Sequence, residues 1–219
     1  MNNVGSRHWS RQTPVRLPSP RKASSVAYDP KHGVVVLFGG SGLNDTWVWN
    51  GKTWTQLDQV SSPSPRMSAC MVYDMANERI VLFGGVDSSG NPLGDTWTWN
   101  GTVWKPHYPN SSPPPRHGAT MAYDVARQQA VLFGGETYGR RIGTLLNDTW
   151  TWDGITWTQQ AALTRPSVRL GASMAYDSLH QQIVLFGGTG GSNLFNDTWL
   201  WNGTTWVEPS PALYPAARA

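Results

Sequence analysis

Residues 80–104 read "IVLFGGVDSSGNPLGDTWTWNGTVW", and two patterns in this stretch decide the fold. The apolar run that ends in Gly84 and Gly85 predicts a short strand that is buried on both faces. The segment 95–104 places Asn-Gly between two alternating runs, which is the strongest short-range signal for a β-hairpin. Together the two patterns predict three consecutive antiparallel strands.

The same pattern recurs along the chain. The steps are 45, 50 and 53 residues, because "VLFGG" ends at Gly40, Gly85, Gly135 and Gly188. Each copy opens on Pro-x-Arg or a close variant and continues with a small-residue run that ends in Tyr-Asp, such as "SACMVYD", which predicts a further strand. Each repeat is therefore expected to be a four-stranded meander. The four complete repeats cover about residues 21–58, 66–108, 116–161 and 169–208.

Composition agrees with an all-β fold class. The 219 residues include 23 Gly, 16 Pro and 13 Trp, while charged residues make up only 14%. The net charge is +3 and its cations are dispersed, so we expect no nucleic-acid partner. No apolar run has the length of a signal peptide or a membrane span, which predicts a soluble chain, with no membrane partner, in an unknown compartment.

The tryptophans follow the repeat. With a two-residue turn at Asn50-Gly51, Trp49 faces Lys52 and Trp47 faces Trp54. All three indoles then lie on one face of the sheet, and the other repeats carry the same trio. We interpret these tryptophans as packing between neighbouring sheets rather than as a sugar-stacking platform.

The motifs resemble those of kelch-repeat β-propellers, within the galactose-oxidase-like superfamily. The resemblance rests on "LFGG", the preceding Tyr-Asp, the later Trp, the Pro-x-Arg and a period near 50, and it covers about residues 9–218. It implies that each repeat is one four-stranded antiparallel blade, and that residues 1–219 form a single propeller domain or a propeller fragment.

An additional N-terminal strand is expected. Trp9 precedes Arg21 by 12 residues, which is the spacing between the last Trp of each repeat and the next repeat Arg. Three accounts fit this orphan strand: a fragment of a longer propeller, a four-bladed ring with a spare strand, or a homo-oligomer such as a dimer that completes the ring.

Candidate chemical groups fit the repeat better than a reaction. Cys70 holds the position of Ser25, Thr120 and Ser173 in the other repeats, so we interpret it as a small residue near the axis. The five histidines are scattered, and we predict no metal site, no cofactor and no catalytic residues. Repeated Arg and Asp residues are expected to pair with each other rather than to form a cationic ring: Arg21, Arg66, Arg116, Arg169, Asp45, Asp95, Asp148 and Asp197.

Residues that differ between repeats concentrate in two kinds of connection. One joins the second strand of a repeat to its third strand, as in "VDSSGNPLGD" and "ETYGRRIGTLLND", and the other joins the fourth strand to the next repeat. In a meander both kinds leave the sheet at the same end, which we call the loop face. The candidate ligand-binding residues on this face are Asp87, His107, Tyr108, His117, Tyr138, Arg140, Arg141 and Phe195.

The sequence therefore predicts a non-catalytic binding scaffold that presents its loop face to an unknown protein or glycan. Two alternatives stay open. One is a carbohydrate-active enzyme of the oxidase, epimerase or lyase type, as the resemblance implies, with a site near His117. The other is a purely structural repeat or assembly module.

Overall fold

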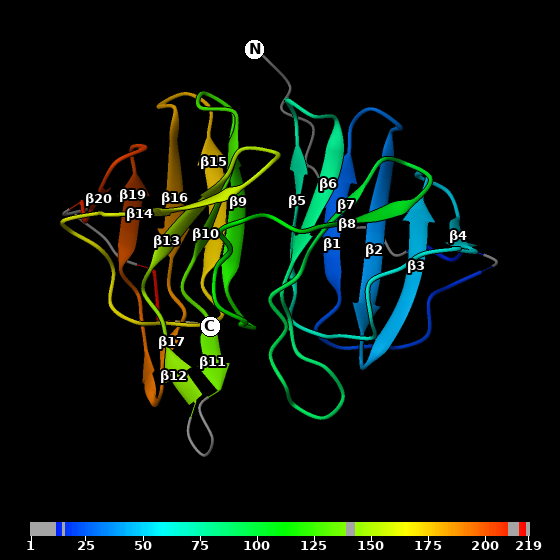
Figure 1. The fold of residues 1–219 in the computed structure, drawn as a ribbon, viewed down its shortest axis with the longest axis horizontal. Coiled ribbons are helices and arrows are strands. Elements are labelled where there is room, and N and C mark those ends of the chain that lie inside the picture. The colour runs from blue at the N-terminus through cyan, green and yellow to red at the C-terminus, as the bar shows by residue number, and fades with distance from the viewer. Residues whose placement is uncertain (1–11, 15, 139–142, 210–214, 218–219) are drawn as a thin grey trace, which may run out of the picture.

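The computed structural model describes residues 12–14, 16–138, 143–209 and 215–217. These residues contain strands and turns but no helix, which confirms the all-β fold class (Figure 1). Trp9, and with it the expected N-terminal strand, lies outside the described residues.

Each repeat forms one four-stranded antiparallel sheet, and within a sheet the strands lie in chain order. Sheet 1 contains β1 (Ser25–Asp29), β2 (Val34–Gly40), β3 (Leu43–Trp49) and β4 (Trp54–Leu57). Sheet 2 contains β5 (Cys70–Asp74), β6 (Arg79–Phe83), β7 (Thr96–Trp99) and β8 (Trp104–His107). Sheet 3 contains β9 (Thr120–Asp124), β10 (Gln129–Phe133), β13 (Thr149–Trp152) and β14 (Trp157–Gln160). Sheet 4 contains β15 (Ser173–Asp177), β16 (Gln182–Phe186), β19 (Thr198–Trp201) and β20 (Trp206–Val207).

Two short hairpins extend from the connections between second and third strands. One consists of β11 (Glu136–Tyr138) and β12 (Gly143–Leu145), between β10 and β13, and the other of β17 (Thr189–Gly190) and β18 (Asn193–Leu194), between β16 and β19. The first of them projects from the lower end of the molecule in Figure 1. These hairpins place residues that differ between repeats at one end of the sheets.

The hairpin turn of each repeat is longer than predicted. Trp49 pairs with Trp54 rather than with Lys52, so the turn comprises residues 50–53 and the two-residue turn is wrong. The cause is the Asn50 side chain, whose Oδ1 accepts hydrogen bonds from the N–H groups of Lys52 and Thr53, both at 3.0 Å. Residues that face each other across two strands point to the same side, so the tryptophans still share one face.

The double glycine after each second strand is required by a close approach. Gly84 and Gly85 have φ angles of 67° and 101°, in the left-handed region that favours glycine. A Cβ on Gly84 would lie 2.6 Å from the carbonyl oxygen of Arg116, which belongs to the next repeat. The same carbonyl accepts a hydrogen bond of 2.9 Å from Gly85 N–H. "FGG" therefore marks the point where consecutive repeats touch.

The four sheets pack face to face in an open row. Their first strands contact one another in order, β1 with β5, β5 with β9 and β9 with β15. Among the described strands no comparable contact joins β1 to β15. Sheets 1 and 4 therefore stand at opposite ends of the row, at the right and the left of Figure 1, and each has one outer face without a neighbouring sheet among the described strands.

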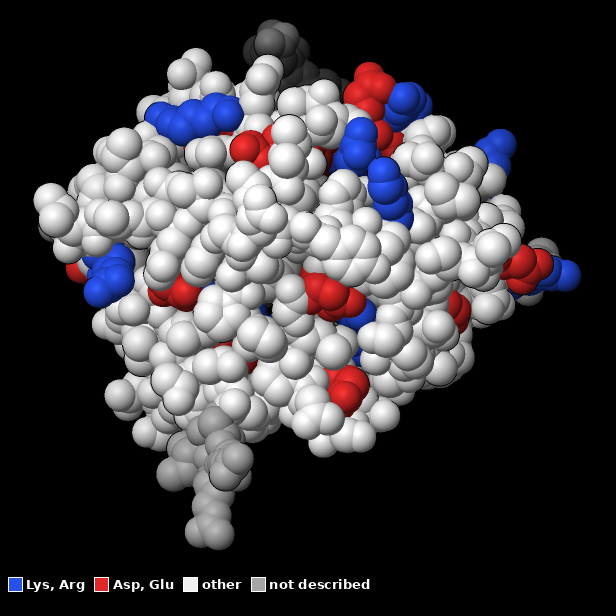
Figure 2. Space-filling view, in the orientation of Figure 1, with Lys and Arg blue, Asp and Glu red and all other residues white. Residues whose placement is uncertain are grey.

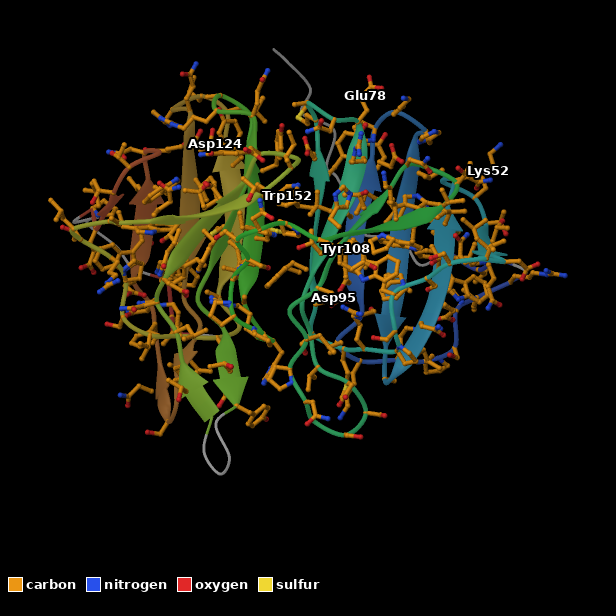
Figure 3. The ribbon with its side chains drawn as sticks, viewed as in Figure 1. Lys52, Glu78, Asp95, Tyr108, Asp124 and Trp152 are labelled. Carbon is orange, nitrogen blue, oxygen red and sulfur yellow. The ribbon has the colours of Figure 1, made fainter. Side chains whose placement is uncertain are left out.

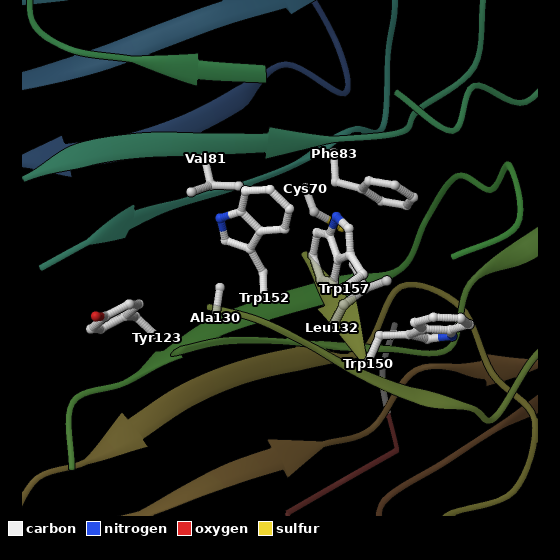
Figure 4. Close-up of a cluster of buried hydrophobic side chains, with 9 residues drawn as sticks. All are labelled: Cys70, Val81, Phe83, Tyr123, Ala130, Leu132, Trp150, Trp152 and Trp157. Atoms are coloured by element: carbon white, nitrogen blue, oxygen red, sulfur yellow. The ribbon is translucent and has the colours of Figure 1, made fainter. Parts of the chain in front are cut away.

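Tryptophans fill the space between neighbouring sheets. Between sheets 2 and 3, Trp152 and Trp157 point from sheet 3 toward Val81 and Phe83 of sheet 2 (Figure 4). An aromatic side chain removes roughly 150–250 Å² from water when it is buried, so these contacts provide much of the apolar stabilisation. The interpretation of the tryptophans as packing residues is confirmed for the sheet contacts that the structure describes.

Candidate functional site

Isolated β-bridges join the two kinds of connection that make up the loop face. In sheets 2, 3 and 4, the segment that enters the first strand pairs with the connection between second and third strands through a β-bridge. The three bridges are Met67 with Val86, His117 with Glu136, and Leu170 with Thr189. The two kinds of connection are thus held together at the lower end in Figure 1.

A hollow beside Tyr108 is lined by several of the candidate residues' neighbours. It is a cavity of about 620 Å³ on sheet 2 and the connection that follows β8. Tyr108 is 88% exposed and lies with Asp95 where the chain passes from sheet 2 toward sheet 3 (Figure 3). The wall is apolar and rich in proline, because Pro106, Pro109, Pro113, Pro115 and Trp97 contribute to it.

Asp95 gives this pocket a fixed hydrogen-bond acceptor. Its carboxylate accepts hydrogen bonds from Arg66 at 2.6 and 2.8 Å and from the indole of Trp97 at 2.6 Å. Burial alone would raise the pKa of this carboxyl, but the hydrogen bonds and charge of Arg66 outweigh burial and lower it. The Asp95 side chain is 39% exposed, more than its counterparts in the other three pairs. Its exposed part can accept a ligand hydroxyl or amide.

His107 lines the same pocket but belongs to a strand. The sequence suggested that His107 lies in the connection after the fourth strand, but it is the last residue of β8. Its Nε2 lies 2.9 Å from Thr98 Oγ1, and its ring packs edge-on against Trp152 of sheet 3. Burial first, and then the charges of Lys105 and Arg79, lower the pKa of His107. This histidine is a neutral wall of the pocket near pH 7 rather than a mobile ligand.

A second cluster forms where β11 meets the start of sheet 3. His117 and Tyr138 stack with ring centroids 5.5 Å apart and an angle of 26° between their planes. His117 Nε2 lies 3.6 Å from a carboxylate oxygen of Glu136 and makes no hydrogen bond among the described residues. Tyr138 is half exposed, so its ring shields the histidine from solvent. The structure thus brings together two candidates that are 21 positions apart in the chain.

The remaining candidates are engaged in local structure or are not described. Asp87 closes its own loop, because its carboxylate accepts hydrogen bonds from Ser89 N–H and from both nitrogens of Asn91 at 2.8 to 3.0 Å. Phe195 lies under the guanidinium of Arg169, whose Cζ is 4.2 Å from the ring centroid. Arg140 and Arg141 lie outside the described residues.

The repeated arginines and aspartates pair as the sequence predicts. The shortest nitrogen to oxygen distance is 2.6 Å in all four pairs, Arg21 with Asp45, Arg66 with Asp95, Arg116 with Asp148 and Arg169 with Asp197. Each guanidinium also donates to a glycine carbonyl at the end of the second strand. Since every one of these four cations is neutralised by its own carboxylate, they do not form a cationic ring.

Cys70 is enclosed and protonated. Its Sγ donates to the carbonyl of Ala119 at 3.0 Å, just as Ser25 Oγ in sheet 1 donates to the carbonyl of Ala69 at 2.8 Å. Burial raises the pKa of the Cys70 thiol to about 12. A thiol in this state is not a nucleophile near pH 7. The interpretation of Cys70 as a small residue in the repeat position of Ser25 is confirmed.

Neither the surface charges nor a comparison with known proteins points to a ligand. On the face shown in Figure 2, acidic and basic side chains are scattered among uncharged ones. The described residues contain no group of three or more His, Cys, Asp or Glu side chains that could hold a metal ion. In the same part of the chain, no helix has the length and apolar character needed to cross a bilayer. Neither the protein-family models nor the curated proteins compared with this chain match it.

Proposed function

We propose that the four sheets are blades of a kelch-type β-propeller, and that the chain is a non-catalytic binding scaffold for a protein or a glycan. The blade proposal is supported by four consecutive four-stranded meanders and by the tryptophans packed between them. The repeated ion pairs and indoles are occupied in building these sheets. Binding is therefore assigned to side chains that the repeat leaves exposed.

The pocket beside Tyr108 is the single observation that carries the binding proposal. A volume of about 620 Å³ suits a disaccharide or a few residues of a peptide. The exposed Tyr108 ring offers a flat apolar face with a hydroxyl group at its end, and aromatic residues of this kind dominate recognition surfaces. Asp95 adds a fixed acceptor that can orient a hydroxyl or an amide group.

Tyr138 provides a second exposed aromatic ring, apart from the pocket. Its half-exposed ring lies on the β11–β12 hairpin, next to His117 and Glu136. An enzyme site near His117 has the histidine and carboxylate pair in its favour. The stacked Tyr138 ring covers the histidine, however, and a general acid or base must reach the proton that it moves. The arrangement favours binding through the exposed tyrosine over catalysis by the covered histidine.

The test uses an array of defined oligosaccharides and a library of displayed peptides as two separate probes. We expect the unaltered chain to select a set of related structures from one of them. Tyr108→Ala should weaken the selected interaction at least about tenfold, since truncating an aromatic anchor removes most of its contact.

Ile155→Ala is the matched control, because Ile155 is an exposed apolar side chain in the turn between β13 and β14, away from the pocket. It should bind as the unaltered chain does. Selection of no structure from either probe, or unchanged binding by Tyr108→Ala, would contradict the proposal.

A further inference from the structure

The three contacts between neighbouring sheets share one pattern of side chains. The tryptophan that opens the fourth strand of a sheet inserts into the preceding sheet, where its indole N–H donates to a threonine hydroxyl at 2.9 Å. The same indole packs on a phenylalanine with ring centroids 5.1 to 5.3 Å apart. The three sets are Trp104 with Thr46 and Phe38, Trp157 with Thr96 and Phe83, and Trp206 with Thr149 and Phe133.

The outer face of sheet 1 carries the inserting half of this pattern. Trp54 opens β4 at the position of Trp104, and it packs against Trp49 as Trp104 packs against Trp99. Trp54 is only partly buried, and its indole N–H has no hydrogen-bond partner among the described residues. Tyr28 on the same face is 57% exposed, whereas its counterpart Tyr123 in sheet 3 is 6% exposed.

The outer face of sheet 4 carries the receiving half. Phe186 and Thr198 hold the positions of Phe83 and Thr96, but none of the indoles that the structure describes lies against them. In its place is a hollow of about 180 Å³, lined by Ser173, Met174, Ala175, Val184 and Phe186. Val184 and Phe186 are partly exposed here, while the corresponding side chains of the inner sheets are buried.

Within the described part of the chain, the backbone also leaves one hydrogen-bonding group without a partner at each end of the row of sheets. A run of hydrogen bonds crosses the sheets near their first strands, from Ser68 N–H to Ala23 O, from Gly118 N–H to Ser68 O and from Gly171 N–H to Gly118 O. Among the described residues, the N–H of Ala23 and the carbonyl of Gly171 are left without partners. A donor thus remains at sheet 1 and an acceptor at sheet 4.

We propose that the outer face of sheet 1 binds the outer face of sheet 4 in a second copy of this chain. Trp54 of one copy inserts into the hollow beside Phe186 of the other, and its indole N–H donates to Thr198 Oγ1. Ala23 N–H donates to the Gly171 carbonyl across the same contact. This contact repeats the pattern that already joins the sheets within one chain.

A second copy is the partner that these faces fit best. Both halves of the pattern occur in one chain, and they match the inner contacts residue by residue. A partner of another kind would have to reproduce the indole at one end and the phenylalanine and threonine at the other. The contact is heterologous, so it either closes two copies into a ring or continues into a longer assembly.

Solution mass by light scattering is the first measurement. At about 100 µM protein, we expect a mass of twice the 24.1 kDa of one chain, as closure into a two-copy ring would give. A larger head-to-tail assembly also supports the contact. A mass of 24.1 kDa under these conditions would overturn the proposal.

Single variants identify the two faces. Trp54→Ala removes the inserting indole and Thr198→Arg blocks the receiving face, so each should raise the dissociation constant at least about 30-fold. Leu163→Arg is the matched control, because Leu163 is exposed in the connection after sheet 3 and its substitution should leave the mass unchanged. Far-ultraviolet circular dichroism and the melting temperature check that each variant is folded.

Mixing the two variants gives the decisive result. Trp54→Ala keeps a functional receiving face, and Thr198→Arg keeps a functional inserting face, so a mixture can form one intact contact. We expect each variant alone to be a single chain and the mixture to form a one-to-one pair. Failure of folded variants to pair on mixing, or association of either variant alone as strong as that of the unaltered chain, would overturn the proposal.

Discussion

Phe83 and Phe186 end the same "IVLF" motif in sheets 2 and 4, but their surroundings differ. Phe83 is 1% exposed and its ring centroid lies 5.1 Å from that of Trp157. Phe186 borders an open hollow, and no indole from the described part of the chain lies against it. Each phenylalanine pairs with a threonine on the third strand of its sheet, so the difference in exposure comes mainly from the neighbouring sheet.

This difference shows that the same motif can contribute different amounts to folding stability in different repeats. In an array of repeats, stability is the sum of terms within each repeat and terms between neighbours. Phe83 contributes to both kinds of term, whereas Phe186 contributes mainly to the first. Substitutions at equivalent positions of sheets 2 and 4 therefore separate the two terms.

The largest difference is expected for the phenylalanines themselves. Phe83→Ala should lower the free energy of unfolding by about 3–5 kcal/mol, because it leaves a cavity between two packed sheets. Phe186→Ala should lower it by less than half as much, since solvent already reaches the side chain. Urea unfolding of both variants in the Trp54→Ala background, where we expect a single copy, gives the comparison. Equal losses would mean that the contact between sheets adds nothing.

Acid should weaken sheets at the end and in the middle of the row alike, because each Arg–Asp pair belongs to a single repeat. Burial alone would raise the pKa values of Asp45 and Asp148, but Arg21 and Arg116 respectively outweigh burial and lower them. A carboxyl with a lowered pKa stabilises the folded chain above its unfolded pKa of about 3.9, and this contribution is lost as the pH falls through the folded value.

The urea midpoint should therefore decrease as the pH falls below about 4. Asp148→Asn and Asp45→Asn should each be less stable near neutral pH and show a shallower decrease with acid. Midpoints measured between about pH 2 and pH 7 test this expectation. If only one of the two substitutions reduced the decrease of the midpoint with acid, the contribution of an Arg–Asp pair to stability would depend on the position of its sheet in the row.

The threonine acceptors should show a smaller difference than the phenylalanines. Thr96→Val leaves the buried indole N–H of Trp157 without its acceptor, which costs about 1–3 kcal/mol of folding stability. Thr198→Val, in the Trp54→Ala background, removes no side-chain hydrogen bond to any described residue and should change stability by less than about 0.5 kcal/mol. Thermal unfolding distinguishes the two values, and equal effects would contradict the assigned hydrogen bond.

The sequence predicted the features that recur with the repeat. The four-stranded meanders, the shared face of Trp47, Trp49 and Trp54, and the pairing of Arg21 with Asp45 depend on spacing within one repeat. Each spacing occurs four times in the chain, so the prediction does not depend on a single chance occurrence. The position of Cys70 followed from the same register.

The features that the sequence missed depend on contacts outside one repeat or on a single side chain. The turn at Asn50 has two more residues than predicted because its side chain binds two backbone N–H groups. The engagement of His107 by Trp152 joins two repeats, and that of Phe195 by Arg169 depends on the single phenylalanine that the last repeat carries in its connection. The exposure of Asp95 in the Tyr108 pocket likewise depends on how one connection folds back.

The smallest substitution moves a thiol between two equivalent positions, one buried between sheets and one on the outer face of sheet 4. Cys70 and Ser173 are equivalent, but Cys70 is buried between sheets and Ser173 is exposed on the outer face of sheet 4. A Cys70→Ser, Ser173→Cys variant moves the thiol from one place to the other with little change in volume. In dilute solution at pH 8, it should react with a disulfide reagent at least about a thousandfold faster than Cys70 does in the unaltered chain.

Protein concentration then links this reactivity to the contact between copies. If Trp54 of a second copy covers the hollow that Ser173 lines, labelling of Ser173→Cys should slow as the concentration rises, while labelling of Cys70 stays constant. Adding Trp54→Ala to the variant should abolish the concentration dependence but leave the fast reaction. A thiol at position 173 that is as unreactive as Cys70 in dilute solution would mean that a single chain already covers this face by itself.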